Sequence, residues 1–484
     1  MDIQQLEPQK LWTSFCELNA VPRPSKKEER VIEFMLKFGQ GLNLKTLRDE
    51  AGNVIIKKPA TPGMEHCQTV ILQSHLDMVH QKNAQTTFDF NNQGIDMFID
   101  GDWVRANGTT LGADNGIGVA AIMALLESKD ITHPSLEAFF TIDEETGMTG
   151  AKQMDATLLS GTILLNLDTE DDDELSVGCA GGIDTNTHYN YQKEPLINGF
   201  EGIEIQLSGL LGGHSGMDID KGRGNANKML ARLIWELQQT QNIQLISFDG
   251  GSLRNAIPRE AHALVAVENK NNALSFIGQF ESLLKSEYNP IEKHLKISAK
   301  AINLDSDSDA VSALEFQKIL NTLCGVHNGV YRMSPDIEGL VEASSSLARV
   351  VIKNGEFITQ SLQRSSVEST KKEVSMAFGS AFENLGAKVE QSGDYPGWKP
   401  NLNSEILKLL KDQYIQLFNE EPNVKACHAG LECGILSEKL HGVDMISFGP
   451  NIRAAHSPDE CVQISSVQKF WNFLLEILQK IPTA

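Results

Sequence analysis

Four apolar runs that lack polar alternation place the strongest constraint on the fold of this chain. They lie at residues 70–74 (VILQS), 136–142 (LEAFFTI), 162–167 (TILLNL) and 444–450 (DMISFGP). Helical patterns occur between them, such as NGIGVAAIMALLES at residues 115–128, where apolar residues recur at helical spacing. A strand that is apolar on both sides needs a cover on both sides, so these runs indicate a mainly parallel sheet covered by helices. The sequence therefore predicts an α/β fold.

The middle of the chain has a different pattern. Runs such as FEGIEIQLSGL at residues 200–210 and HALVAVENK at residues 262–270 alternate apolar with polar residues, and helical patterns lie between them. This alternation favours an antiparallel sheet with helices. Because 484 residues exceed what one hydrophobic core usually covers, we expect two domains. Residues 1–185 and 392–484 would form the α/β domain, and residues 186–391 would form an inserted α+β domain.

The charge of the chain argues against two classes of partner. Lysine and arginine number 42 against 64 aspartates and glutamates, a formal net charge of −22, which repels nucleic-acid phosphates and anionic lipid surfaces. No apolar stretch reaches the roughly 18 residues of a spanning helix. The opening residues, MDIQQLEPQK, lack the basic start and apolar core of a signal peptide. We therefore expect a cytoplasmic protein that binds neither nucleic acid nor membrane.

Residues with metal-ligand chemistry follow the predicted parallel strands. His75 and Asp77 end the first run, Asp143, Glu144 and Glu145 follow the second, Asp168 follows the third, and His456 comes shortly after the fourth. Asp114 lies in a glycine-rich turn, TTLGADNGIG, that opens a predicted helix. Ligands bind where parallel strands end at their carboxyl edge, so these side chains could meet there.

The types of side chain at this edge suit a divalent ion. Two imidazoles and three carboxylates without cysteine form a nitrogen and oxygen ligand set that zinc accepts, and one shared carboxylate would let five side chains hold two ions. Each residue alone also has a structural explanation, such as a helix N-cap for Asp114 or a charged loop for Glu144 and Glu145. The spacing alone leaves the metal site and the structural explanation open.

Ten motifs carry a resemblance to a known family. In order along the chain they are SHLDMV, GTTLGADNGIG, DEETGMTGA, NLDTE, GCAGGID, GLLGGHSG, GSLRNAIPREA, YPGW, HAGLECG and GPNIRAAHSPDE, spread over residues 74–460. With them the chain resembles the dinuclear zinc metallopeptidases that include aminoacylase and glutamate carboxypeptidase. Within that family it is most similar to the aminoacyl-histidine dipeptidases, also called Xaa-His or carnosinase-like dipeptidases. The resemblance covers essentially the whole chain.

The resemblance implies a role for each residue of the predicted metal site. Asp114 is implied as the bridging carboxylate, with His75 and Asp168 completing one ion and Glu145 and His456 completing the other. Glu144 is implied as the general base that activates a metal-bridging water. Two divalent ions are expected, and zinc is favoured, although cobalt and manganese accept the same ligands.

Asp77 belongs to the same site through His75. The period of two along a strand puts Asp77 on the side of His75, where its carboxylate can accept the ring N–H that faces away from the metal. That contact would hold the imidazole in one tautomer. The resemblance also implies a cis peptide bond between Asp114 and Asn115.

Three residues of the inserted domain, which is a lid in this family, match substrate-binding positions. Arg364 matches the arginine that binds the substrate carboxylate, and its planar fork suits bidentate pairing. His214 matches the histidine that contacts the substrate carbonyl, and Asn255 matches a polar contact. They can act only if the lid closes over the sheet edge. Whether Glu432 or Arg254 also contacts substrate stays open.

The expected function is metal-dependent hydrolysis of dipeptides with free termini. Histidine-ended dipeptides such as carnosine are favoured by the resemblance alone. An aminoacylase or deacetylase acting on N-acyl amino acids is the alternative among hydrolases. A metal-binding or peptide-binding protein without catalysis is the alternative from another class, and Glu144 argues against it. The resemblance also favours a homodimer.

Overall fold

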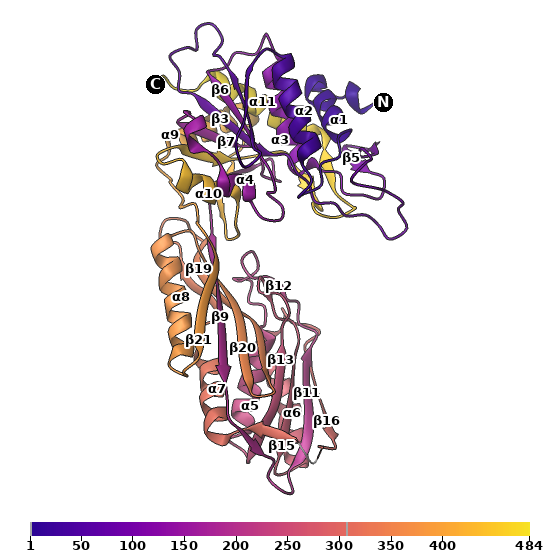
Figure 1. Ribbon diagram of the computed structural model, residues 1–484, viewed down its shortest axis with the longest axis vertical. Coiled ribbons are helices and arrows are strands. Elements are labelled where there is room, and N and C mark those ends of the chain that lie inside the picture. The colour runs from indigo at the N-terminus through magenta and orange to yellow at the C-terminus, as the bar shows by residue number, and fades with distance from the viewer. Residues whose placement is uncertain (1, 306–307) are drawn as a thin grey trace. The chain divides into compact units, whose positions relative to one another are not determined.

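The computed structural model describes residues 2–305 and 308–484, which form two compact units (Figure 1). Unit 1 comprises Met1–Gly178, Pro400–Ala426 and Leu431–Ala484, and unit 2 comprises Cys179–Lys399 and Cys427–Gly430. Unit 1 therefore joins the two ends of the chain, and unit 2 is built from its middle. The assignment of the middle segment as a lid domain stays a prediction.

An eight-stranded sheet forms the centre of unit 1, in the order β1-β2-β6-β3-β7-β23-β8-β22. Its strands are β1 (Lys45–Arg48), β2 (Val54–Lys58), β3 (Val70–His75), β6 (Leu136–Thr141), β7 (Ile163–Asn166), β8 (Glu174–Cys179), β22 (Asn423–Cys427) and β23 (Asp444–Ser447). The four central strands pair in parallel, as β6 with β3, β3 with β7, and β7 with β23. The strands β1, β2 and β8 pair antiparallel. The predicted α/β fold with a mainly parallel sheet is confirmed.

Complete burial explains the apolar runs of the central strands. Every residue of β3, β6 and β7 is buried, so both sides of these strands are covered. The helices of unit 1 are α1 (Gln9–Asn19), α2 (Glu29–Gly41), α3 (Ala113–Glu127), α4 (Thr149–Gln153), α9 (Glu405–Phe418), α10 (Glu432–Lys439) and α11 (Ile464–Gln479), with short 3-10 helices at Ile3–Gln5 and Ala156–Leu158. Helix α3 packs on β3 and α1, and α9 packs on β23 and α11.

A small second sheet in unit 1 joins distant parts of the chain. Its order is β24-β25-β5-β4, formed by Ile452–Arg453, Cys461–Gln463, Trp103–Ala106 and Met97–Asp100. Strand β25 pairs with β5. Because β25 pairs with β5, the loop between β24 and β25 is tied to the segment that runs from β5 into α3.

The start of α2 differs from what its local sequence favours. Ser25 and Glu28 have the spacing of a capping box, yet α2 begins at Glu29, its N-cap residue is Glu28, and no side chain caps its first turn. The Ser25 hydroxyl instead donates to the Asp77 carboxylate at 2.8 Å. Glu28 accepts the backbone N–H of Lys26 at 2.8 Å. The tertiary contact with Asp77 has replaced the local cap.

Unit 2 is built on a nine-stranded antiparallel sheet. Its strands are β9 (Gly181–Asn190), β11 (Glu201–Ser208), β13 (Ile243–Gly250), β15 (Ala261–Val267), β16 (Lys296–Ile302), β18 (Gly329–Met333), β19 (Val341–Lys353), β20 (Glu356–Ser365) and β21 (Lys388–Tyr395). They follow the order β16-β11-β15-β13-β19-β20-β9-β21, with β18 paired to β19. Two small pairs join β10 (Lys193–Pro195) to β17 (Asp309–Val311) and β12 (Gly213–His214) to β14 (Ala256–Ile257).

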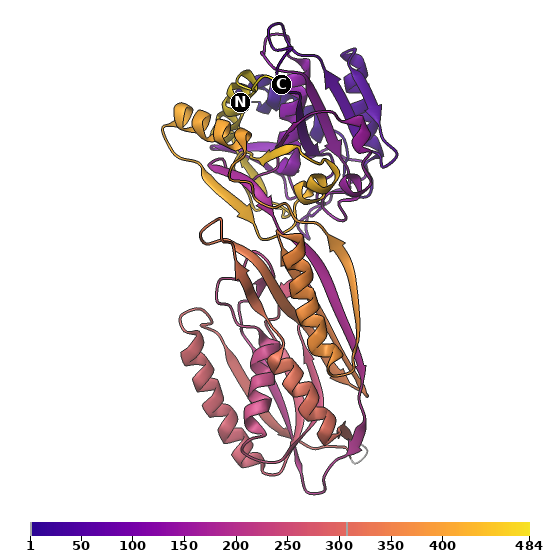
Figure 2. The same ribbon diagram turned by 90° about the vertical axis from the view of Figure 1, so that its left-hand side faces the viewer.

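Helices cover this second sheet and give unit 2 its own core. They are α5 (Ala226–Leu237), α6 (Lys270–Tyr288), α7 (Ala313–Gly325) and α8 (Glu368–Glu383), and Figure 2 shows them along one face of the sheet. Leu230 and Ile234 of α5 pack with Ile205, Val265 and Phe357 of the strands. Within the described part of the chain, no helix combines the length and apolar character needed to cross a membrane.

Candidate metal centre

The residues predicted as metal ligands lie at the carboxyl ends of the central strands of unit 1. His75 is the last residue of β3, Glu144 and Glu145 follow β6, and Asp168 follows β7. Asp114 lies at the start of α3, where its backbone departs from helical angles. His456 lies in the loop between β24 and β25. The peptide bond between Asp114 and Asn115 is cis.

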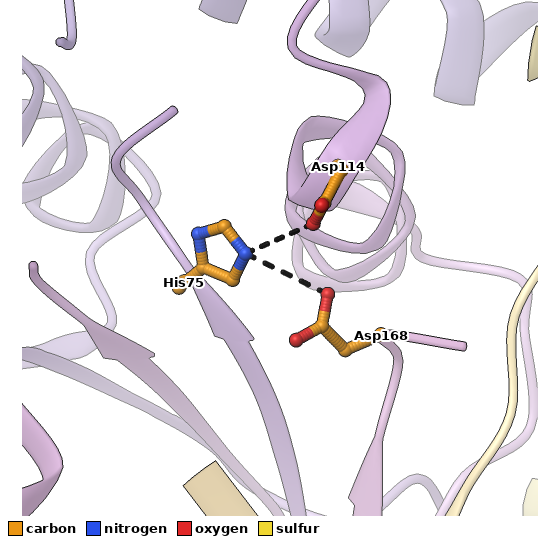
Figure 3. Close-up of side chains that lie close together, drawn as sticks. All are labelled: His75, Asp114 and Asp168. Atoms are coloured by element: carbon orange, nitrogen blue, oxygen red, sulfur yellow. Dashed lines mark hydrogen bonds and ion pairs between the residues drawn. The ribbon is translucent and has the colours of Figure 1, made fainter. Parts of the chain in front are cut away.

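Asp114 lies between two histidines. Its Oδ1 atom is 3.1 Å from Nε2 of His75, and its Oδ2 atom is 3.1 Å from Nε2 of His456. His75 Nε2 is also 3.6 Å from Asp168 Oδ1, and Figure 3 shows the imidazole facing both aspartates. His456 Nε2 is 2.9 Å from Glu145 Oε2. The two oxygens of one carboxylate therefore face two separate groups of side chains.

These contacts define two candidate ligand groups that share Asp114. One is His75, Asp114 and Asp168, and the other is Asp114, Glu145 and His456; within each group the ligand atoms lie within 4.8 Å of one another. Each group offers one imidazole nitrogen and carboxylate oxygens, a set that suits zinc and similar divalent ions. Glu145 Oε1 is buried and has no hydrogen-bond partner among the described residues. An orphaned buried carboxylate oxygen is costly unless a cation is bound, so these residues fit a pair of divalent ions.

The protonation of this cluster shows the same demand for positive charge. Although burial opposes ionisation of Asp114, hydrogen bonds from His456 and His75 hold its pKa well below the usual carboxyl range. Hydrogen bonds to Asp114 and Glu145 raise the pKa of His456 to about 11. Burial raises the pKa of Asp168 well above its ordinary value. These shifts follow from the dense negative charge that the carboxylates place around the two imidazoles.

Glu144 differs from its neighbour Glu145 in its surroundings. Its carboxylate lies within 4.8 Å of ligand atoms of His75 and Glu145, and burial raises its pKa well above the ordinary value. The nearby charge of Glu432 adds to this rise. Glu145 lies against His456 instead. The two consecutive glutamates therefore occupy different environments.

Asp77 connects the first histidine to these glutamates. Its carboxylate accepts the backbone N–H of Glu144 at 3.0 Å and that of Glu145 at 3.3 Å. The Nδ1 atom of His75 lies 3.1 Å from the main-chain oxygen of Asp77 and 3.5 Å from its carboxylate. Asp77 thus contacts the ring nitrogen on the far side from Asp114, and it also holds the loop that carries Glu144. No pattern in the sequence indicates this second contact.

Asp143 is a further residue of this loop that sequence reasoning did not single out for a role. It is buried, its φ is 55°, and it accepts the Lys26 amine at 2.7 Å. It also accepts the hydroxyls of Thr146 and Thr149. The two threonines within six residues of Asp143 were the available sequence signal, because hydroxyls near an aspartate often close a turn.

The predicted substrate residues form a second cluster, within unit 2. Arg364 is buried, and its guanidinium lies 3.2 Å from Nε2 of His214 and 2.8 Å from the hydroxyl of Tyr395. The Nδ1 atom of His214 accepts the backbone N–H groups of Gly216 and Met217. Burial and the charge of Arg364 lower the pKa of His214 to about 4. The ring is therefore neutral, and both of its nitrogens face N–H donors, Nδ1 the backbone and Nε2 the guanidinium of Arg364.

The backbone places Asn255 beside this cluster. The β12 and β14 strands pair His214 with Ala256, and the main-chain oxygen of Asn255 accepts the Ser215 N–H at 2.8 Å. The Asn255 side chain is exposed. Arg254 forms an ion pair with Asp184 at 2.7 Å.

Two polar residues of the HAGLECG motif, His428 and Glu432, are buried. His428, in unit 2, contacts the Ser344 hydroxyl at 2.8 Å through Nε2. Glu432, in unit 1, accepts Gln73 at 2.7 Å and Thr141 at 2.6 Å through Oε2. Burial raises the pKa of Glu432 to about 7. Its carboxylate therefore lies against β3 and β6, near the strand ends that carry the candidate ligands.

Comparison with known proteins gives consistent matches over the whole chain. The sequence profile of Peptidase family M20/M25/M40 matches residues 71–480 of this chain. The chain is 42% identical over 486 residues to the cytosol non-specific dipeptidase of Escherichia coli (strain K12), covering 99% of each. A crystal structure of aminoacylhistidine dipeptidase from Vibrio alginolyticus matches with a TM-score of 0.95 and 42% identity, covering 100% of this chain and 99% of that one. Aminopeptidase PepT from Bacillus cereus shares the fold, with a TM-score of 0.57 and 16% identity over 98% of this chain and 99% of that one.

Proposed function

The chain belongs to the peptidase family M20/M25/M40, and we propose from this premise that it is a metal-dependent dipeptidase acting on Xaa-His dipeptides with free termini. Two full-length relatives at 42% identity are dipeptidases by name, one a cytosol non-specific dipeptidase and the other an aminoacylhistidine dipeptidase. The name of the Escherichia coli relative also supports a cytosolic location.

The position of Asp114 is the observation that carries this proposal. Its two carboxylate oxygens face His75 and His456 at 3.1 Å each, as a carboxylate shared by two ions would. Family members use a dinuclear metal site. We assign His75, Asp114 and Asp168 to one ion and Asp114, Glu145 and His456 to the other, and we propose zinc as the metal because of the mixed nitrogen and oxygen ligands.

The chain's own residues supply the proton transfers. When bound, two divalent ions polarise the scissile carbonyl and lower the pKa of a water molecule. Glu144 accepts a proton from the attacking water and delivers it to the amine that leaves, a role that its raised pKa suits. Asp77 orients this base, since it accepts the backbone N–H of Glu144.

The residues of unit 2 would recognise the substrate. Arg364 offers a planar guanidinium to the free carboxylate of a dipeptide. His214 would contact the substrate carbonyl as negative charge develops on its oxygen. Asn255 would add a polar contact to the substrate, a role that only the family resemblance implies. A homodimer is part of the proposal and is tested by light scattering coupled to size-exclusion chromatography.

The test combines elemental analysis with hydrolysis assays. We expect two zinc ions per chain, and cleavage of free Xaa-His dipeptides that stops when a chelator removes the metal. Glu144→Gln should keep both ions and lower kcat by orders of magnitude. Unchanged turnover in that variant would remove Glu144 as the base. Cleavage of N-acetylated amino acids without cleavage of free dipeptides would select the aminoacylase alternative instead.

A further inference from the structure

A buried carboxylate outside the ligand set holds the backbone that carries Asp114. Glu460, which is 2% exposed, lies in the same loop as His456, between β24 and β25. Its two oxygens accept four consecutive backbone N–H groups, those of Leu111 at 2.7 Å and Gly112 at 2.9 Å on Oε2, and those of Ala113 at 2.8 Å and Asp114 at 3.2 Å on Oε1. Successive N–H groups that converge in this way form an anion-binding concavity. Here the anion is a side chain from 346 residues further along the chain.

A buried arginine holds the carbonyl side of the same loop. Arg23 is 1% exposed. Its guanidinium donates to the carbonyl oxygen of Gly112 at 2.6 Å, and to those of Leu76 and Asp77 at 3.1 and 3.2 Å. Gly112 therefore gives its N–H to Glu460 and its carbonyl to Arg23. These two charged side chains link the loops that carry His75, Asp114 and His456.

The close approach of these groups leaves no space beside the loop. Gly112 has a φ of 70°, and a Cβ atom built on it would lie 2.6 Å from a guanidinium nitrogen of Arg23 and 2.8 Å from the sulfur of Met78. A buried carboxylate and a buried guanidinium are costly unless their hydrogen-bonding groups are satisfied. The backbone of residues 111–114 pairs with both oxygens of Glu460, and the Gly112 carbonyl accepts one hydrogen bond from Arg23, so the loop and the two side chains constrain one another.

We propose that Glu460 and Arg23 are positioning residues of the dinuclear centre. Glu460 fixes the backbone of the shared carboxylate Asp114 relative to His456, and Arg23 fixes the same loop relative to His75. Residues that orient metal ligands typically change metal affinity or activity 10- to 100-fold when they are mutated. The inference rests on the proposed function, because it assigns Asp114 to both ions.

The first test replaces Glu460 and measures metal binding directly. In Glu460→Gln, the new NH2 group would face N–H donors that it cannot pair with. Titration of the chelator-treated protein with zinc, against a competing chelator, should show two ions in the original protein. We expect roughly 10- to 100-fold weaker affinity for at least one of them in the variant. Asp459→Asn is the matched control, because it removes a carboxylate from an exposed neighbour. We expect both zinc affinities of this control to be unchanged.

A second readout separates positioning from general stability. Excess zinc should restore most of kcat in Glu460→Gln with little change in KM, because the variant reacts through the same residues once both ions are bound. Arg23→Lys keeps the charge and loses the planar fork, and we expect it to weaken zinc binding in the same direction. If Glu460→Gln does not fold, Glu460→Asp replaces it, because the shorter side chain cannot reach all four N–H groups.

The inference would be overturned if a folded Glu460 variant and Arg23→Lys both bound two zinc ions as tightly as the original protein. A fall only in the unfolding temperature of the metal-free protein would then show that the two residues are purely structural. Failure of the proposed function is seen separately, since the original protein would then bind no ion pair or would cleave no dipeptide.

Discussion

His428 is a histidine that the interior of unit 2 keeps neutral. Burial and the charge of Arg364 lower its pKa to about 3, whereas an unfolded histidine titrates near pH 6.5. As the pH falls below about 6.5, the unfolded chain binds a proton that the folded chain does not, so this group makes folding less favourable toward acid pH. Each unit of pKa difference corresponds to about 1.4 kcal/mol, and the effect reaches on the order of a few kcal/mol.

This sign can be checked by thermal unfolding of the protein between pH 7.5 and 4.5. We expect the unfolding temperature of His428→Gln to fall less with decreasing pH than that of the original protein. His80→Gln is the control, because His80 is exposed. Parallel pH profiles for all three proteins would contradict the buried, neutral state of His428.

Arg364 is the residue on which recognition of the free carboxyl terminus depends. A hydrogen bond to a charged group contributes roughly 1.5–3 kcal/mol, so Arg364→Ala should lower kcat/KM for free dipeptides roughly 10- to 150-fold. The expected loss is mostly in KM. Carboxyl-amidated dipeptides should be poor substrates of the original protein and should lose little further in the variant. Equal cleavage of free and amidated dipeptides by the original protein would exclude this role.

At the scale of the elements, the turn that opens α3 requires a glycine for two separate reasons. Gly112 has a φ of 70° and almost no space for a Cβ atom, whereas Gly101, in the hairpin between β4 and β5, has a φ of 62° and open space around it. The left-handed conformation costs a side chain roughly 1–2 kcal/mol at either position. Only Gly112→Ala also pushes against Arg23.

The comparison of these two glycines predicts unequal effects. In urea unfolding, Gly101→Ala should lose about 1–2 kcal/mol of unfolding free energy, and Gly112→Ala should lose more. Only Gly112→Ala should also bind zinc more weakly, because the backbone that it displaces carries Asp114. Equal losses in both variants would show that the contact with Arg23 is unimportant.

At the scale of the whole molecule, all five proposed metal ligands belong to unit 1, and unit 2 has a hydrophobic core of its own. Calorimetry should therefore resolve two transitions, and removing the metal should lower the temperature of only one of them. A ligand at 1,000 times its Kd stabilises the folded state by about 4 kcal/mol. A shift of both transitions by the same amount would mean that the units unfold together.

The local pattern of the sequence was sufficient for the central elements. The runs at β3, β6, β7 and β23 predicted a parallel sheet, since burial on both faces leaves a continuous apolar signal. The same runs ended at His75, Glu145 and Asp168, and strand ends converge at one edge. The antiparallel direction of β1, β2 and β8 was not predicted, because strand direction depends on which partner a strand meets.

The residue types likewise predicted a nitrogen and oxygen ligand set. The resemblance to the metallopeptidase family added that Asp114 is the shared carboxylate. What only the tertiary structure decided is how the loops around Asp114 are held. Ser25 looks like a helix cap but bonds to Asp77, and Glu460 ends one of the motifs without any pattern to indicate that it accepts four N–H groups. The physical reason is that periodicity records burial along a local segment, whereas these hydrogen bonds join residues whose separation in the chain carries no periodic signal.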